Sequence, residues 1–348
     1  ISFGLWAHHM FATGLPNVSL SLFSAASMMV TIPTGVQIFC WIATLADGRP
    51  RLTVPMLFVL GFLFIFVLGG LTGVMLAAVP FNLQAHDSYF VVAHLHYVLI
   101  GGMVFPLFAG AYYWIPHATG RMMSDRLGQW VFWLMFVGFN AAFLPMHVTG
   151  LAGMPRRIAV YPDGLGWDWL NLWSTVFAYV FAAGVALFCI DFFRHRKVGK
   201  PAPRDPWGAA TMEWLYPPLP PGYNCRAIPA VTSREPLWDQ PELQAPERLQ
   251  GALVTPRDGR RETIGCHPAT GQPIQILRLP HPTWVPLICA ALTALVFVAA
   301  LLKMYAFAGV AGAAAVLSFV WWGWEASDSG VRRDTGAGYA LPVNVVSA

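Results

Sequence analysis

The chain has 348 residues, of which 56% are hydrophobic and 11% charged, and its mean hydropathy is +0.54. Because soluble domains carry about 25% charged residues, this composition excludes a purely water-soluble globular protein. The formal net charge of +4 is spread along the chain and gives no indication of nucleic-acid binding.

Five apolar segments follow one another in the first part of the chain, each long enough to cross a bilayer as a helix. A backbone that faces lipid must satisfy its hydrogen bonds internally, and the segments lack the alternation of barrel strands, so we predict helices. No charged segment precedes the first of them, and the chain begins with Ile1, so we interpret the N-terminus as truncated or excised and not as a signal peptide. The predicted spans are residues 18–45, 54–79, 89–115, 127–146 and 170–193.

The composition changes abruptly after residue 193. Residues 194–282 are rich in Pro, Arg and Gln, and we expect an aqueous linker with little regular structure. Two further spans are predicted at residues 284–303 and 305–324, and the second ends in a Trp cluster typical of a membrane interface. The sequence thus predicts an all-α integral membrane protein, a polytopic helix bundle, with a core at 1–193, a linker at 194–282 and a two-helix extension with a tail at 283–348.

Basic residues in alternate loops orient the predicted bundle, because cytoplasmic loops carry an excess of Lys and Arg. The loops on one side hold nine of them, and the opposite side of the five-span core has only Arg156 and Arg157. We predict that the first side is cytoplasmic and that the linker and the C-terminus, with Arg332 and Arg333, lie there too. The nine are Arg49, Arg51, Arg121, Arg126, Arg194, Arg196, Lys197, Lys200 and Arg204.

Two histidines lie inside the third predicted span, in YFVVAHLHYVLIGG. His94 and His96 are two residues apart, so on a regular helix their side chains point about 200° away from each other. They are poorly placed to share one metal ion, but each could be an axial ligand to a different haem iron. The alternative is a pair of buried polar residues bonded to neighbouring helices.

A histidine pair, His8 and His9 in WAHHMF, precedes the first span, and neighbouring imidazoles suit a copper or zinc ion. Two ligands do not complete such a site, and an interfacial pair without a special role stays open. His86 and Asp87 form a second polar pair in an otherwise uncharged loop. A carboxylate suits Mg²⁺, although an Asp that caps a helix is the simpler alternative.

The paired guanidinium groups of Arg156 and Arg157 suit carboxylates such as haem propionates, although a topogenic or lipid-headgroup role stays open. We assign no function to the remaining histidines, His117, His147, His195, His267 and His281. The five cysteines show no CxxC spacing, so neither a disulfide framework nor a thiolate metal site is indicated. They are Cys40, Cys189, Cys225, Cys266 and Cys289.

The motifs WAHHMF, TIPTGVQIFCW, HDSYFVVAHLHYVL and GLAGMPRR, in this order and spacing, resemble subunit I of the haem-copper terminal oxidases. The resemblance runs from residue 1 to about 224 and corresponds to the last five of the twelve core helices. Residues 225–348 resemble only weakly the tails of long bacterial forms, and we expect there a linker and two helices that pack against a neighbouring subunit.

The resemblance implies roles for individual residues. His8 and His9 are similar to two of the three copper ligands, His94 to the ligand of the high-spin haem and His96 to a ligand of the low-spin haem. His86 and Asp87 resemble the magnesium pair. Arg156 and Arg157 resemble the arginines that hold the haem propionates.

The implied cofactors are two haems, expected to be a-type, with copper and magnesium. The implied activity is cytochrome-c oxidase, reducing O₂ to water with coupled proton translocation in a bacterial inner membrane. The implied partners are the upstream half of subunit I, a copper-bearing subunit II, subunit III, cytochrome c and membrane lipid. A quinol oxidase, a nitric-oxide reductase of the same superfamily and a non-catalytic helix bundle remain alternatives.

The sequence departs from the family pattern in three respects. The third copper ligand, its cross-linked tyrosine and the second low-spin haem ligand belong to the upstream half, so we expect no activity from this chain alone. Gln37, after Thr34 and Gly35, occupies the position of a frequent proton-conducting lysine, so we expect a modified proton path. Asn82 stands where a carboxylate near the haem is frequent.

Overall fold

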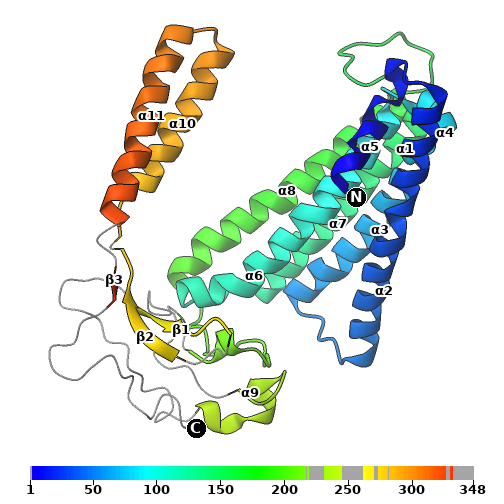
Figure 1. The fold of residues 1–348 in the computed structure, drawn as a ribbon. Coiled ribbons are helices and arrows are strands. Elements are labelled where there is room, and N and C mark those ends of the chain that lie inside the picture. The colour runs from blue at the N-terminus through cyan, green and yellow to red at the C-terminus, as the bar shows by residue number, and fades with distance from the viewer. Residues whose placement is uncertain are drawn as a thin grey trace, which may run out of the picture. The chain divides into compact units, whose positions relative to one another are not determined.

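The computed structural model describes residues 2–216, 218, 231–244, 262–269, 273–280, 282–326 and 330–331 (Figure 1). The chain forms two compact units, Ile1–Ala202 and Pro203–Ala348. Two of the noted cations, Arg332 and Arg333, together with Cys225 and His281, lie outside the described residues.

All regular elements described in the first unit are helices, joined by loops, and this confirms the predicted polytopic bundle. All five predicted core spans coincide with helical segments long and apolar enough to cross a membrane. The elements are η1 (Ser2–Thr13, 3₁₀), α1 (Asn17–Met29), α2 (Thr31–Asp47), α3 (Val54–Ala77), α4 (Val79–Ala85), α5 (Tyr89–His96), η2 (Tyr97–Val104, a π-helix), α6 (Phe105–Thr119), α7 (Asp125–Leu151) and α8 (Asp168–Val198).

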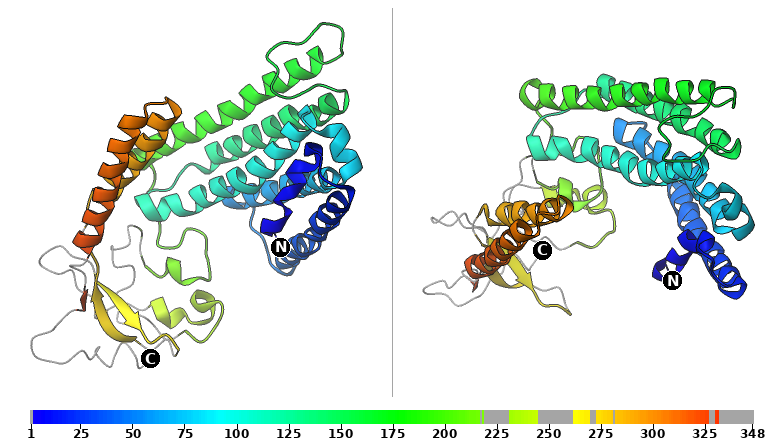
Figure 2. Two further views of the ribbon diagram at one scale, coloured as in Figure 1. Left: turned by 45° about the horizontal axis from the view of Figure 1, so that its top comes forward. Right: turned by 90° about the horizontal axis from the view of Figure 1, so that it is seen from above.

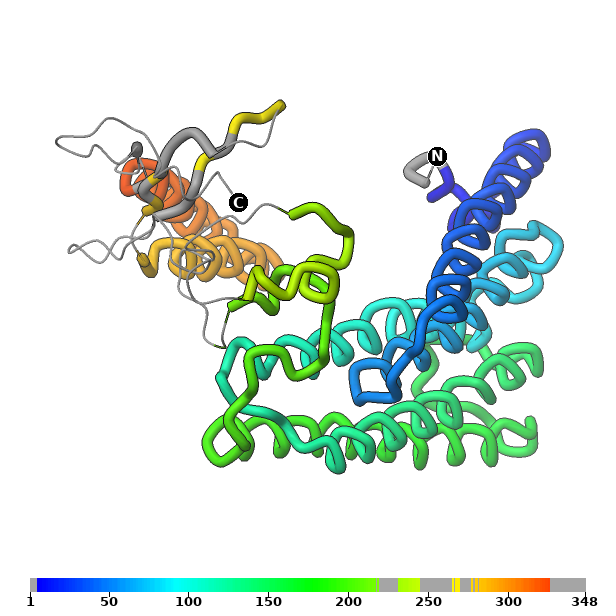
Figure 3. The backbone as a smooth tube through the Cα atoms, turned by 90° about the horizontal axis from the view of Figure 1, so that it is seen from below, coloured from blue at the N-terminus to red at the C-terminus, as the bar shows by residue number. Residues whose placement is uncertain are grey.

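The first span is broken into α1 and α2 at Val30, which the sequence analysis did not anticipate. Pro33 explains the break, because proline has no N–H to donate to the carbonyl one turn earlier. At the break, Val30 N donates to Ser27 O, three residues earlier, at 3.3 Å, which is the bond of a tighter turn than an α-helical one. Figure 3 shows the α1–α2 segment set apart from α7 and α8, with α3 between them. No residue of α2 is buried.

The third span changes its helix type in the middle. Its buried residues recur at every fourth position, at Ala93, Tyr97, Gly101, Phe105 and Ala109. In an α-helix, two residues four positions apart point about 40° away from each other. A longer series at this spacing would therefore rotate out of the core. The π-helix η2 has more residues in each turn, which keeps the series on one side.

The α7–α8 pair forms one side of the bundle (Figure 2) and packs at close range through glycines. A Cβ added at Gly138 would lie 2.5 Å from Phe181 N, and one added at Gly184 would lie 2.7 Å from Met135 Cγ. The core lies between α7, α3 and α6. It is largely aromatic, with Phe58, Phe105, Tyr112, Phe132 and Phe139 buried.

The second unit contains two apolar helices, α10 (Val285–Leu301) and α11 (Tyr305–Ala326). Residues 305–325 meet the length of a membrane span, and the 17 residues of α10 fall just short of it. Three short strands, which were not predicted, form an antiparallel sheet in the order β1-β2-β3. The remaining elements are η3 (Met212–Trp214), α9 (Pro236–Asp239), η4 (Pro241–Gln244), β1 (Glu262–Cys266), β2 (Pro273–Arg278) and β3 (Gly330–Val331).

Candidate functional site

His94 and His96 contact different helices, on opposite flanks of α5. The His94 ring lies against α3, where its Nδ1 is 3.1 Å from Gly69 O and 3.0 Å from Thr72 Oγ1. The His96 ring lies against α7 and stacks on Phe143, with centroids 4.3 Å apart and planes 18° apart. The two imidazoles therefore do not share a pocket.

Both rings keep Nε2 available as a ligand. His96 Nδ1 lies 2.7 Å from Val92 O, so each imidazole can donate its Nδ1–H to a backbone carbonyl. Such a bond leaves the lone pair on Nε2, the usual arrangement of a metal-ligating histidine. Gly73 supplies room on the α3 side, because a Cβ there would lie 2.9 Å from His94 Cε1. The donor chemistry of both residues fits axial ligation of haem iron.

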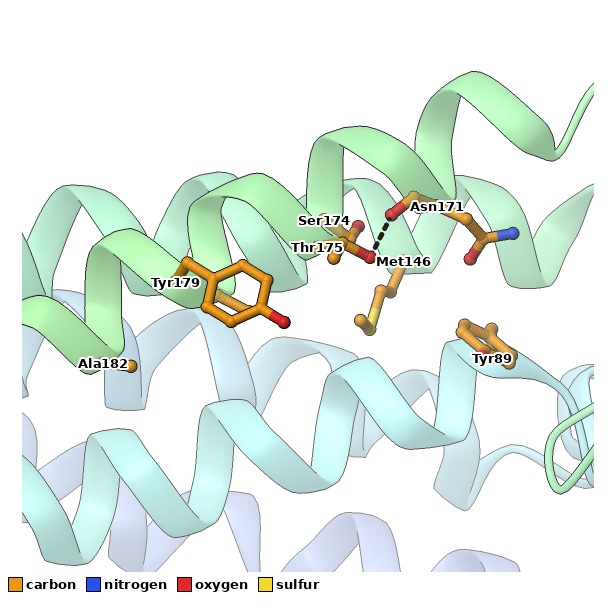
Figure 4. A pocket seen from close by; sticks show the side chains of 8 residues that line it. Tyr89, Met146, Asn171, Ser174, Thr175, Tyr179 and Ala182 are labelled. Atoms are coloured by element: carbon orange, nitrogen blue, oxygen red, sulfur yellow. Dashed lines mark hydrogen bonds between the residues drawn. The ribbon is translucent and has the colours of Figure 1, made fainter. Parts of the chain in front are cut away.

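A cavity of about 390 Å³ lies between α5, α7 and α8 (Figure 4). Tyr89 lines it, and His96 follows Tyr89 by seven positions, so both lie on the same face of α5. Met146, Asn171, Ser174 and Tyr179 line the rest of the wall together with Thr175, Ala178 and Ala182. The hydroxyl of Ser174 is buried without a hydrogen-bond partner in the described part of the chain. The cavity thus offers mostly apolar walls on the His96 flank, with the hydroxyl of Ser174 as a buried polar group that has no partner in the described residues.

The structure brings His8 and His9 together at their Nε2 atoms, which are 3.1 Å apart. Two imidazole nitrogens about 2.0 Å from one metal ion, at an angle of 90–110°, would be about 2.8–3.3 Å from each other. The pair therefore fits a shared ion, in addition to the hydrogen bond that the same distance allows. Ser27 on α1 holds the ring of His8, because its Oγ lies 3.1 Å from His8 Nδ1. Burial, followed by the charge of His9, lowers the pKa of His8, which favours the neutral ligand form.

No group of three or more His, Cys, Asp and Glu side chains in the described residues could hold a metal ion. The His8–His9 pair thus lacks a third such ligand from within the described part.

Asp87 links the loop before α5 to the loop after α7. Arg156 contacts Asp87 Oδ1 through both Nε, at 2.6 Å, and Nη2, at 2.5 Å, and Arg156 N donates to Asp87 O at 2.7 Å. The hydrogen bond from Arg156 is the largest cause of the lowered pKa of Asp87. Asp87 and Arg157 both have positive φ, 57° and 66°, which is uncommon for residues other than glycine. The N-cap of α5 is Ser88 and not Asp87.

The second carboxylate oxygen of Asp87 is directed at His86. Asp87 Oδ2 lies 3.4 Å from His86 Nε2, close to the roughly 3 Å that separates neighbouring ligands of an octahedral Mg²⁺ with bonds of about 2.1 Å. Arg156 is bound to Asp87, so of the predicted arginine pair Arg157 is the one without an ion pair in the described residues. The nitrogen of His86 and the free carboxylate oxygen of Asp87 therefore form a donor pair that fits a cation, next to the guanidinium group of Arg156.

Thr34 and Gln37 lie on α2, away from the histidines of α5. Thr34 Oγ1 donates to Val30 O at 3.0 Å, and Gln37 is exposed. Asn82 is buried and donates to Leu76 O at 3.1 Å, while its Oδ1 has no partner in the described residues. The buried Asn82 Oδ1 lies on α4, the helix before α5, and its lack of a partner is consistent with a polar ligand or a water molecule there.

No function was assigned to His147 from the sequence, but its surroundings are unusual. Its side chain is buried, its ring lies 5.0 Å from Phe90 and 5.4 Å from Tyr97, and its Nε2 has no hydrogen-bond partner in the described part of the chain. The available signal was the helical spacing, because His147 follows Phe143, which stacks on His96, by one turn. His195 pairs instead with buried Asp191, at 2.6 Å.

The family model described as "Cytochrome C and Quinol oxidase polypeptide I" matches residues 1–181. Three curated relatives are named "Cytochrome c oxidase subunit 1". Identity is 38% with the protein of Bacillus sp. (strain PS3), covering 83% of this chain and 44% of the relative. It is 50% with that of Synechocystis sp., covering 62% and 39%, and 43% with that of Bacillus subtilis, covering 68% and 38%.

The chain therefore spans less than half the length of these relatives. A solved structure titled "Cryo-EM structure of a heme-copper terminal oxidase dimer provides insights into its catalytic mechanism" aligns with 56% of this chain and 39% of that one, at 19% identity and a TM-score of 0.48.

Proposed function

Because the chain belongs to the family of cytochrome c and quinol oxidase polypeptide I, we propose that it supplies part of the catalytic subunit of a respiratory oxidase that reduces O₂ to water. Its helices make it a multi-pass membrane protein. The family implies haem and copper as cofactors. The assignment of two haems, expected to be a-type, and of magnesium is our proposal.

The arrangement of α5 between α3 and α7 is the observation that carries this proposal. A helix with one imidazole on each flank can bind two haems at a short, fixed separation. His94, held by Gly69 O and Thr72 Oγ1, would ligate the haem that faces copper, and His96 the low-spin haem. The cavity beside Tyr89 supports a planar group on the His96 flank. When bound, the haem irons and copper supply the redox chemistry.

The protein's own residues orient these ligands. Ser27 Oγ bonds to His8 Nδ1 and so directs His8 Nε2 towards His9. His94 and His96 are fixed in the same way, through Nδ1 bonds to backbone carbonyls. Because the rings are held before any metal binds, little side-chain entropy is lost on binding.

The outer loops would hold the anionic and cationic groups of the site. His86 Nε2 and Asp87 Oδ2 would ligate Mg²⁺, and Arg157, with Arg156 behind it, would hold haem carboxylates. The bond from Arg156 keeps Asp87 ionised, since it lowers the pKa of that carboxyl. Gln37 can hydrogen-bond water but, unlike a lysine, cannot become positively charged by taking up a proton. We therefore propose that the proton path along Thr34 and Gln37 is modified.

The proposed partners follow from what this chain lacks. Among the described residues, Ser27 is the one buried residue of α1, and no residue of α2 is buried, which supports an upstream half of subunit I against these helices. Subunit II with its copper, subunit III and cytochrome c as the electron donor complete the proposal, with the bacterial inner membrane as location. A quinol donor remains the alternative, since the family model includes both oxidase types.

Difference spectra of the intact membrane complex test the proposal. His94→Ala should abolish the high-spin, CO-binding haem signal and largely spare the low-spin bands, and His96→Ala should remove the low-spin bands. An unchanged CO-binding signal in His94→Ala, or an absence of haem in the wild-type complex, would refute it. Metal analysis separates an oxygen reductase, with copper beside the haem, from a nitric-oxide reductase, with non-haem iron there.

A further inference from the structure

Six cations gather at the inner end of α6, α7 and α8 without acidic partners. Among the described residues, none of the six forms an ion pair. The acids nearby are Asp125, beside Arg126, and Asp191, which is buried and bound to His195. The six cations are Arg121, Arg126, Arg194, Arg196, Lys197 and Lys200.

Backbone pairing draws the loop after α6 to the chain after α8. Met122 N donates to Lys200 O at 2.8 Å, Arg121 Nη1 donates to Gly199 O at 2.9 Å, and Ala202 N donates to Gly120 O at 3.0 Å. Cations far apart in sequence, such as Arg121 and Lys200, thus lie in one place. The concentration of positive charge is a property of the fold and not only of loop composition.

The register of α7 on α8 aligns the cations with one another. Gly138 lies against Phe181 and Met135 against Gly184, so a step towards the start of α7 corresponds to an equal step towards the end of α8. Continued in this register, Arg126 lies level with Phe193, one residue before Arg194, and Trp130 lies level with Cys189, one residue before Ile190. The charged level is followed, one turn deeper, by an apolar level.

The same side of the helix pair presents both levels. At about 100° per residue, Arg126, Trp130 and Trp133 share one face of α7, and Ile190, Arg194 and Lys197 share one face of α8. The opposite faces of both helices pack into the aromatic core. Trp130, Trp133 and Ile190 are 57%, 51% and 59% exposed, and Arg126, Arg194 and Lys197 are exposed too.

We propose that this outer face of α7–α8, the inner-end basic face, binds an anionic phospholipid of the inner leaflet. Guanidinium groups pair with phosphate by charge-assisted hydrogen bonds, and clustered cations at a membrane surface attract anionic lipid. The exposed Trp130, Trp133 and Ile190 would contact the acyl chains. An acidic protein segment would satisfy the charged level but not the apolar level beneath it, whereas one phospholipid satisfies both.

Native mass spectrometry of the detergent-solubilised complex, with added phosphatidylglycerol or phosphatidylcholine, tests the proposal. Removing two cations in Arg126→Gln/Arg194→Gln should weaken phosphatidylglycerol binding about 25-fold, since each cation near an anionic surface contributes about fivefold. The single variants should each show about fivefold weakening, which keeps the test valid if the double variant does not assemble.

The control is Arg49→Gln, which removes one charge from the loop after α2, outside the six cations, and is compared with the single variants. This variant should bind phosphatidylglycerol as the wild type does, and an equal loss would show a general charge effect and overturn the proposal. So would unchanged binding in the test variants, equal retention of phosphatidylcholine, or displacement of the lipid by millimolar inorganic phosphate. Trp130→Ser/Trp133→Ser should weaken lipid binding without reducing the complex's haem content.

Discussion

The replacement of Gly73 by alanine tests whether α3 sets the position of the His94 ring. The new Cβ would lie 2.9 Å from His94 Cε1, about 0.5 Å closer than ordinary contact. The ring cannot retreat freely, because its Nδ1 is 3.1 Å from Gly69 O and 3.0 Å from Thr72 Oγ1. Overpacking costs about 1–3 kcal/mol, and the loss of a hydrogen bond costs about 1 kcal/mol more.

We expect Gly73→Ala to assemble with a reduced content of CO-binding haem and a shifted high-spin band, while the low-spin bands stay unchanged. The matched control is Gly70→Ala on the same helix, where an added Cβ meets nothing within 4 Å. CO-difference spectra and haem content per complex provide the readout. A Gly73→Ala complex that equals both wild type and control would show that α3 does not determine the position of this ring.

Three further changes test other contacts. Arg156→Gln removes the main cause of the lowered pKa of Asp87, so the Asp87 carboxyl should take up a proton at a higher pH than in the wild type. Because the protonated carboxyl is a poor metal ligand, the variant should lose Mn²⁺, bound in place of Mg²⁺, at a higher pH than the wild type in a titration followed by paramagnetic resonance. Ser27→Ala should lower copper content several-fold with haem retained, and Ser27→Thr should restore it; equal copper in all three would argue against orientation of His8 by this hydroxyl. Gly150→Ala would place Cβ 2.0 Å from a backbone nitrogen of α5, so no assembled complex is expected by size-exclusion chromatography.

The helical membrane architecture could be predicted from sequence because long apolar segments in lipid have few alternatives. The opposed placement of His94 and His96 followed from the helical period alone. The break at Val30 and the π-helix could not be predicted in this way, since both depend on the local backbone and on what the neighbouring helices bury. The short strands of the second unit were missed because their segment is rich in proline and polar residues.

In the candidate site, too, the sequence shows the local features and misses the contacts between distant segments. Pairs close in sequence, such as His8 with His9, were visible as motifs. Contacts between distant segments were not: the bond between Arg156 and Asp87 joins two loops, and the sequence assigned these residues to separate sites. His147 was set aside because a histidine near a span end is ordinary, and only its burial and orphaned Nε2 distinguish it.

The π-helix η2 accommodates extra chain length in the middle of the third span, because its turns hold more residues than those of an α-helix. Deleting one residue within Tyr97–Val104 would convert the wide turns to ordinary ones, and the narrower turns would compensate for most of the lost rotation. Phe105 and Tyr112 would then stay directed at the aromatic core, and the imidazoles on α5 would stay where they are. The stretch Tyr97–Val104 is therefore the natural position for a change of length along this helix.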